Sequence, residues 1–390
     1  MELRENTSTR LVQLFHLDKL AFVVMALFSG LALYAAFFTD SQLHDFGNLW
    51  ISADALKEGL NPYAVYPGVS VTDVSWGTIA SVNLNPPPAF FLIRWFAEVP
   101  AATGIMFWRL INICAIGLSL FLLARHYPKM RPMLIAWLLL WPVVTNTITV
   151  GQIYGVLALL TTIAWIDLSG ERAIRAGLLI GLAAAFKPFL LVWVALLLLA
   201  RYGRAALTAG ATFLALNLMA LLVYGPEIYT QWLAVITDRS VHIKMPINIS
   251  FVAPFFHAGL PLAGLIFAGL ILAGLAVWAW FKKPGPEPLS TMAIIGALAC
   301  SPLAWHYYLI FALPVFFWLR WTPLMVAGIV ALSFPRIFIM LAIFERIELP
   351  ALLYYLYPIG FALIVADVMI KLLQAEHTSF TPHPTSGQTA

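Results

Sequence analysis

The sequence predicts an all-α polytopic membrane protein, a bundle of about 12 transmembrane or half-membrane helices with one extended loop after the first span. Of the 390 residues, 62% are hydrophobic and only 10% are charged, too little charge to cover a soluble domain of this size. The apolar residues come in runs of roughly 20, the length at which a helix crosses a bilayer. Short alternating segments, the pattern of a membrane β-barrel, do not occur.

Twelve apolar runs carry this prediction. They lie at 20–38, 104–124, 132–149, 152–168, 174–187, 189–200, 205–224, 257–281, 290–300, 303–319, 323–343 and 352–371. The first run is too long and too weakly marked for cleavage to be a signal peptide, so we expect it to remain as the first span. We expect residues 1–374 to form one transmembrane domain and the polar residues 375–390 to form a disordered cytoplasmic tail.

Basic residues predict the orientation. The formal charge of +4 arises from Lys and Arg scattered at the ends of apolar runs rather than gathered in a patch, which argues against a nucleic-acid partner. A cytoplasmic N-terminus puts 14 of the 22 basic residues in cytoplasmic segments, as the positive-inside rule requires. These are Arg4, Arg10, Lys19, Arg125, Lys129, Arg131, Arg172, Arg175, Arg201, Arg204, Lys282, Lys283, Arg320 and Lys371. Both termini are then expected to be cytoplasmic, and we expect a multi-pass protein of a bacterial inner (cell) membrane, surrounded by lipid.

This orientation predicts two hairpins of half-length helices. Arg175 and Arg201 are both assigned to the cytoplasm, yet one straight helix between them would place them on opposite faces. A break at Lys187-Pro188 resolves the conflict, and a break at Ser301-Pro302 does the same for residues 290–320. Irregular backbone at membrane depth survives where it lines a cavity or packs on protein, so we expect a cavity open to the outer side. A single kinked helix in each place is the alternative.

The long first loop, residues 39–103, is expected to be periplasmic and carries most of the outer acidic residues. Residues 45–58 read as a short surface helix that ends at Gly59 and Asn61-Pro62. Asp45 begins this helix and is followed by Phe46, Trp50 and later Pro62-Tyr63.

This first-loop pattern resembles the signature of glycosyltransferase family 87, within the GT-C superfamily of enzymes that use polyprenyl-phosphate sugars. The resemblance continues along most of the chain in NPPPAFFL (85–92), GQIYGVLALL (151–160), AAFKPFLL (184–191), INISF (247–251) and SPLAWHYY (301–308). Each element alone is weak, whereas five in order on matching spans are fairly specific. The chain departs from the pattern at Tyr154, where the family often has Asn, and at Ile249, where Gln is common.

The resemblance implies a GT-C-type bundle that transfers a sugar, commonly mannose, from a polyprenyl phosphate to a lipid-linked or glycan acceptor, with inversion and without a cofactor. It assigns the role of general base to Asp45. The chemistry agrees with that role, because an acceptor hydroxyl must lose its proton as it attacks the anomeric carbon. The leaving phosphate is already a good anion and needs cations and hydrogen-bond donors rather than an acid.

Several other side chains are candidate substrate contacts. Lys187 is the best candidate for the phosphate, because a lysine at membrane depth is costly and functional by default. His306 follows the second predicted break, and we expect it to meet Lys187 at a shared phosphate site. The remaining candidates for phosphate or sugar are Arg109, Gln152, Asn248, Arg239 and Lys244.

Other chemistries are poorly supported. No clustered His, Cys, Asp or Glu pattern predicts a metal site, and Cys114 and Cys300 are expected to be buried packing thiols. A transporter or flippase of lipid-linked sugars is the rival interpretation, and a non-catalytic subunit of an envelope-glycan complex is a third. Asp45 in an outer loop favours the transferase, because transporters place their key charges at mid-membrane.

Overall fold

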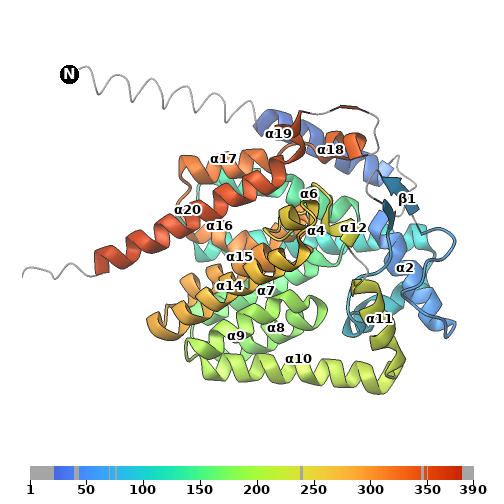
Figure 1. Cartoon of the computed structure of the whole chain (residues 1–390), viewed down its shortest axis with the longest axis horizontal. Coiled ribbons are helices and arrows are strands. Elements are labelled where there is room, and N and C mark those ends of the chain that lie inside the picture. Colours follow the sequence, from blue (N-terminus) through green and yellow to red (C-terminus); the bar gives the residue numbers. More distant parts are fainter. Residues whose placement is uncertain are drawn as a thin grey trace, which may run out of the picture.

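Each of the twelve apolar runs forms helix in the computed structural model, which describes residues 22–38, 44–69, 71–74, 77–237, 240–343, 347–348 and 350–379 (Figure 1). Among these residues, five helices are long and apolar enough to cross a membrane, or six if the bent pair α17 (Pro323–Ala331) and α18 (Arg336–Ile343) counts as one span. Shorter apolar helices form much of the remaining bundle, in agreement with the predicted mixture of full and half spans. The protein is therefore a multi-pass helical membrane protein.

The elements follow one another with short connections. After the first helix, Phe22–Phe38, they are α2 (His44–Lys57), β1 (Val71–Val74), β2 (Gly77–Ala80), η1 (Pro87–Ala89), α3 (Phe90–Ile93), η2 (Arg94–Glu98), α4 (Ala101–His126), α5 (Pro132–Leu140), α6 (Pro142–Thr149), α7 (Tyr154–Ser169), α8 (Ala173–Phe186), η3 (Pro188–Leu190), α9 (Leu191–Leu199), α10 (Gly203–Tyr224), α11 (Glu227–Thr237), α12 (Ser240–Ile243), α13 (Ala253–His257), α14 (Pro261–Lys282), α15 (Pro286–Cys300), η4 (His306–Ala312), α16 (Leu313–Trp318), α17 (Pro323–Ala331), α18 (Arg336–Ile343), α19 (Ala351–Tyr354) and α20 (Leu356–Ser379).

The first loop differs from the sequence prediction in two details. Its helix α2 matches the predicted 45–58 to within one residue, but it is not a surface helix, because Phe46, Leu49 and Ala53 are buried. Between α2 and η1 the chain forms an antiparallel hairpin, with Val71 paired to Ala80, which the sequence analysis did not anticipate. The fold is thus helical with one small two-stranded sheet.

Packing of α8 against α10 shows that the chain reverses at Lys187. Gly177 of α8 lies against Ala205 of α10, and Gly181 lies against Ala209, so both helices run in the same direction. Since α9 ends where α10 begins, α9 must return antiparallel to α8. The predicted hairpin of half-length helices is therefore present, and its tip is the η3 turn after Lys187.

The second predicted hairpin is present as well. The α14–α15 turn lies beside the α9–α10 turn, where the Tyr202 hydroxyl donates to the Pro284 carbonyl at 3.0 Å. At the end of α16, Trp318 contacts Trp165 near the end of α7, with ring centroids 6.2 Å apart, and Trp165 donates to the Tyr127 hydroxyl. Tyr127 and Tyr202 both interact electrostatically with Glu287, at the start of α15. The chain thus enters α15 and leaves α16 at one end of the molecule, which we call the basic end.

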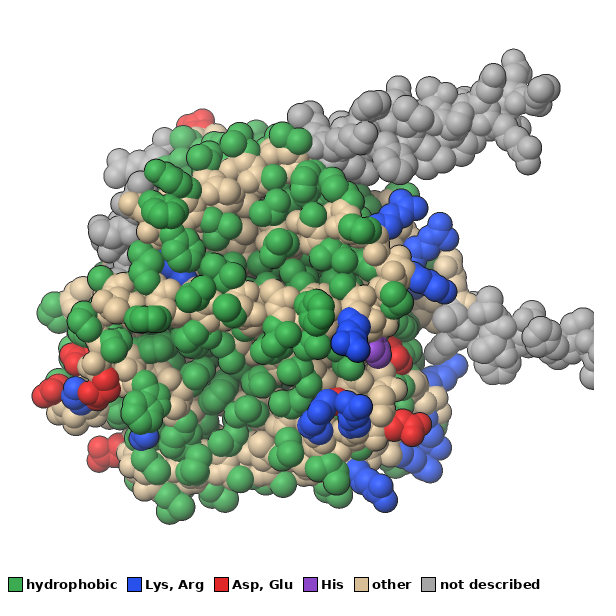
Figure 2. Space-filling view, turned by 180° about the vertical axis from the view of Figure 1, so that it is seen from behind, with side chains coloured by type: hydrophobic (Ala, Val, Ile, Leu, Met, Phe, Trp, Pro, Cys, Tyr) green, Lys and Arg blue, Asp and Glu red, His purple; other side chains and the backbone are tan. Residues whose placement is uncertain are grey.

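The basic end collects the turns that carry the predicted cytoplasmic cations. The ends of α14 and α20 lie on the left of Figure 1, while α2, β1 and α11 lie on the right. Figure 2, seen from behind, shows blue Lys and Arg side chains gathered mainly at the right edge, separated by an apolar belt from the more acidic left edge. This distribution matches the predicted separation of charges.

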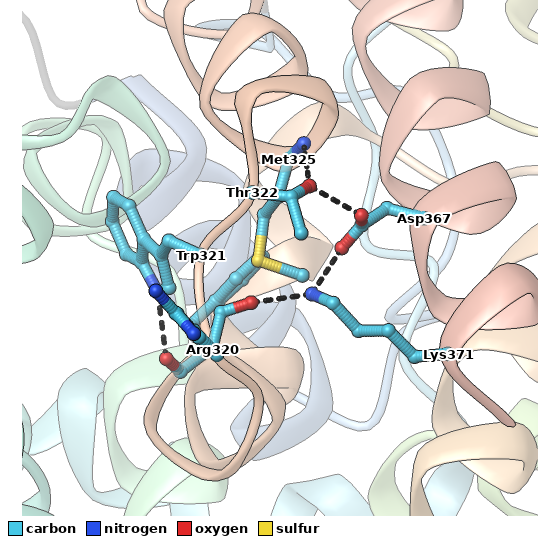
Figure 3. Close-up of polar contacts among 7 residues, drawn as sticks. Arg320, Trp321, Thr322, Met325, Asp367 and Lys371 are labelled. Atoms are coloured by element: carbon cyan, nitrogen blue, oxygen red, sulfur yellow. Dashed lines mark hydrogen bonds and ion pairs between the residues drawn. The ribbon is translucent and has the colours of Figure 1, made fainter. Parts of the chain in front are cut away.

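A polar cluster ties α17 to α20 at the basic end (Figure 3). The Thr322 hydroxyl donates to Asp367 and accepts from the Met325 backbone N–H at 3.3 Å, so that it caps α17. The Lys371 ammonium donates to the same carboxylate and to the Arg320 carbonyl. Because Asp367 is almost fully buried, its charge is balanced within the cluster rather than by water.

The exposure of Cys114 and the start of the C-terminal tail differ from the sequence prediction. Cys300 is buried as expected, but Cys114 lies on an exposed face of α4, because this helix presents one side outward along its whole length. Helix α20 continues to Ser379, so the first residues of the expected disordered tail are helical, and residues 380–390 lie outside the described residues.

Candidate active site

A cavity of about 1120 Å³ lies at the tips of the hairpins. Its walls come from the first helix, the start of α2, the turn after β2, α6, the α8–α9 break, the 305–308 segment and the α17–α18 break. Segments far apart in sequence therefore meet around one space, which joins the first loop to the broken helices.

Asp45 lines this cavity from the first turn of α2. The Gln152 side-chain amide donates to the Asp45 carboxylate at 2.5 Å. Gly151 makes this contact possible: its φ of +72° is left-handed, and a Cβ there would fall 2.7 Å from that of Phe46. The Phe46 N–H also donates to the Val150 carbonyl at 3.0 Å. The Gly-Gln element of the sequence thus holds the base candidate in place.

Lys187 lines the cavity from the tip of the α8–α9 hairpin. Because Pro188 follows, Lys187 is held in an extended conformation (φ −139°, ψ 88°), and the helix ends before it. Its ammonium lies 4.6 Å from the ring centre of Tyr154, 5.1 Å from that of Tyr308 and 3.4 Å from the Tyr308 hydroxyl. The side chain is only 6% exposed, and within the described residues it forms no ion pair.

Arg336 is a second cation on the cavity wall, and the sequence analysis did not single it out. It begins α18 directly after Pro335, where α17 and α18 are bent by 50°. Its buried Nε has no hydrogen-bond partner within the described part of the chain. The sequence feature that could have identified Arg336 is an arginine next to a proline within an apolar run, because this pattern indicates a charged residue at membrane depth.

His306 lies close to this site but behind its wall. The ring is fully buried, and its Nε2 is 2.8 Å from the amide nitrogen of Asn146, which does line the cavity. On its other side the ring packs on Tyr357, with centroids 4.5 Å apart. His306 precedes Tyr308, which accepts a hydrogen bond from Lys187, by two residues in the chain, but its ring does not line the cavity.

Arg109 is buried elsewhere. Its guanidinium donates to the carbonyls of Ala36 and Thr149 (2.9 Å to the latter) and lies over the ring of Phe37. These bonds join the end of the first helix to the end of α6, so Arg109 braces the bundle beside the cavity and does not line it.

Asn248 does not line the cavity either. Its amide donates to the carbonyls of Ile243 and Pro302, both at 2.9 Å, and its oxygen accepts from the N–H groups of Ser250 and Ala304. This set satisfies irregular backbone on both sides of the β-bridge between Asn248 and Trp305. Lys244 is half-buried and not part of the cavity lining, and Arg239 lies outside the described residues.

Among the described residues, no three His, Cys, Asp or Glu side chains come together as a metal site requires. One carboxylate, two cations and several phenols surround a space large enough for a sugar phosphate.

Fold and site together define a membrane-embedded protein with a cavity at the tips of broken helices, lined by charged, polar and apolar side chains. The family model described as Glycosyltransferase family 87 matches residues 83–305, more than half of the chain. The chain therefore belongs to glycosyltransferase family 87. The match includes Gln152 and Lys187 and begins after Asp45. No curated protein and no solved structure matches the chain.

Proposed function

We propose that this glycosyltransferase moves a sugar, with mannose as the first candidate, from a polyprenyl phosphate to a lipid-linked or glycan acceptor, with inversion, at the outer face of a bacterial inner membrane. The observation that carries this proposal is the placement of Asp45, Lys187 and Arg336 on the wall of one cavity. A general base and two cations are what attack by a hydroxyl and departure of a phosphate require.

Asp45 acts as the base. Its carboxylate takes the proton of the acceptor hydroxyl while the hydroxyl oxygen bonds to the anomeric carbon and the bond to the phosphate oxygen breaks. The Gln152 amide donates to one carboxylate oxygen, and a carboxylate has lone pairs left to accept a hydrogen bond from the acceptor hydroxyl. The Tyr307 phenol also interacts with this carboxylate and restricts it further.

Lys187 and Arg336 receive the departing phosphate. The charge that develops on the phosphate oxygens is stabilised most by donors that are already in place and desolvated. Lys187 meets this condition between two aromatic rings, and the half-buried Arg336 meets it through its buried Nε. His306 does not contact the phosphate itself but orients the Asn146 side chain, which lines the cavity.

The apolar side of the cavity suits the polyprenyl chain. The apolar residues Ala32 and Ala35 of the first helix and Ile337 and Met340 of α18 all line this cavity. Small residues on one helix leave room for a chain, and Arg336 at the start of α18 lies where a phosphate at its end would need a partner. A lipid-linked donor fits this combination better than a soluble nucleotide sugar, which has no apolar tail to bury.

The test is Asp45→Asn, with Asp54→Asn as the matched control. Both residues lie on α2, but only Asp45 lines the cavity. With labelled polyprenyl-phosphate mannose and native lipid extract, we expect Asp45→Asn to lower turnover by about 10²- to 10⁴-fold and to leave donor binding intact, because a carboxylate does not hold a phosphate. Asp54→Asn should behave as wild type. Near-normal transfer by folded Asp45→Asn would remove Asp45 from the mechanism.

A further inference from the structure

The turn between β2 and η1 places two asparagines on the cavity wall. Asn83 is 2% exposed and Asn85 is 4% exposed, and both line the cavity. The Nδ2 of Asn83 and the Oδ1 of Asn85 have no hydrogen-bond partner within the described part of the chain. Buried amide groups are rarely left without partners, because each costs roughly 1–3 kcal/mol of desolvation.

The orientation of both amides follows from their bonds. The Asn85 backbone N–H donates to the Asn83 side chain at 2.9 Å, so the accepting atom must be the oxygen, and the remaining group of Asn83 is the NH₂. The same oxygen accepts from the Asn85 side chain at 2.8 Å, so that atom must be the nitrogen, and the remaining group of Asn85 is the oxygen. One donor and one acceptor are therefore left over on two side chains that are bonded to each other.

Bonds from outside the turn hold this pair rigid. The Tyr63 hydroxyl donates to the Asn85 carbonyl at 2.9 Å, and the Trp232 indole donates to the Leu84 carbonyl at 3.2 Å. Pro86 then fixes the exit of the chain toward η1. A preorganised amide pair loses little conformational entropy when a ligand binds.

The free NH₂ of Asn83 and the free oxygen of Asn85 together fit a sugar as the ligand. Each sugar hydroxyl both donates and accepts, so two adjacent hydroxyls match one NH₂ and one carbonyl oxygen. A phosphate offers only acceptors and would leave the Asn85 oxygen unsatisfied, and a hydrocarbon would satisfy neither group.

The position of Asn83 and Asn85 favours the sugar of the acceptor substrate over the sugar of the polyprenyl-phosphate donor substrate. Lys187 and Arg336 both act on the Tyr307–Tyr308 segment, and Asp45 also interacts with Tyr307. The Asn83–Asn85 turn is held instead by Tyr63 of the first loop and Trp232 of α11. In an inverting displacement the acceptor approaches from the side opposite the phosphate.

We propose that Asn83 and Asn85 form a subsite for a neutral glycosyl unit of the acceptor and hold two of its hydroxyls while a third faces Asp45. This inference rests on the proposed function, although the sugar-binding subsite can be tested without any transfer.

The test uses Asn83→Ser, with Asn61→Ser as the matched control. Asn61 forms the same kind of turn, because its side-chain oxygen accepts from the Tyr63 N–H at 2.9 Å, but it does not line the cavity. In both variants a serine hydroxyl can still accept the local N–H, and only in Asn83→Ser does the cavity lose a donor. The probes are methyl glycosides of mannose, glucose and galactose, and binding to nanodisc-embedded protein is read by saturation-transfer NMR.

We expect at least one glycoside to bind wild type and Asn61→Ser, and Asn83→Ser to weaken its affinity by about 3- to 10-fold, the range of one neutral hydrogen bond. A second measurement, the Kd for polyprenyl-phosphate mannose, should be unchanged in Asn83→Ser. No glycoside binding by wild type, or equal binding by all three proteins, would overturn the subsite. A raised donor Kd would overturn its assignment to the acceptor. Glycoside binding that depends on Asn83 in a protein without transferase activity would support the subsite and refute the proposed function.

Discussion

Close contact between α8 and α10 sets the position of Lys187, and Gly181→Ala tests it. A Cβ at Gly181 would lie 2.7 Å from the Cβ of Thr212 and closer still to the Ala209 carbonyl oxygen. Restoring an ordinary contact of about 3.5 Å requires the two helices to separate by about 1 Å. Because α8 ends at Phe186, this shift is passed directly to Lys187.

The expected magnitudes follow from that shift. Overpacking of this kind costs about 1–3 kcal/mol of stability, and a misplacement of about 1 Å in an active site can cost up to about 100-fold in rate. We therefore expect Gly181→Ala to lower the Tm and to reduce turnover by roughly 10- to 100-fold. Turnover with labelled donor and the fluorescence-detected Tm of the purified protein measure the two effects.

Gly210→Ala is the matched control, on α10 itself. No heavy atom lies within 4 Å of a Cβ at Gly210, so alanine should keep activity and stabilise the helix by up to about 1 kcal/mol. Wild-type turnover and Tm in Gly181→Ala would refute the packing argument. Equal loss in both variants would show that glycine flexibility, rather than close packing, is what matters.

Two further predictions concern charge. Lys187→Met and Arg336→Met should each raise the donor Kd and slow transfer by about 10²- to 10³-fold; Lys187→Arg should recover only part of this, because the slot beside the Tyr154 ring holds a compact ammonium. Unchanged donor Kd values in equilibrium binding would remove both cations from the phosphate site. In a background without the native cysteines, Glu58→Cys should react with an impermeant maleimide from outside intact cells and Lys283→Cys only after permeabilisation; the reverse pattern would invert the orientation.

The sequence was most informative where bilayer physics leaves few choices. Runs of about 20 apolar residues must become helices, because every backbone group in hydrocarbon needs an internal partner. The positive-inside rule then required the chain to reverse near Lys187, and the parallel packing of α8 and α10 shows that it does. Asp45 and Gln152, both named from the sequence, also lie together on the cavity wall.

Side-chain direction was beyond the reach of the sequence. The sequence alone does not distinguish an Asn that binds a sugar from an Asn that hydrogen-bonds the backbone. Asn248 is of the second kind, because its side chain forms all four of its hydrogen bonds with backbone groups. Arg109 is similar, because its guanidinium bonds two carbonyls beside the cavity. Arg336 was missed for the opposite reason. It reads as one more arginine in an apolar run, and only the bend between α17 and α18 turns it toward the cavity.

The broken helices explain why these bonds are needed. Each break frees backbone groups at membrane depth, where no lipid can satisfy them. Asn248 serves the break after Ser301 by binding Pro302 and Ala304, and the Tyr357 hydroxyl serves the α17–α18 break by donating to the Phe334 carbonyl at 2.6 Å. With the backbone satisfied in this way, Lys187 and Arg336 at the breaks remain available to a ligand. By satisfying the freed backbone groups, the buried polar residues that do not line the cavity allow Lys187 and Arg336 to lie at the breaks without an ion-pair partner among the described residues.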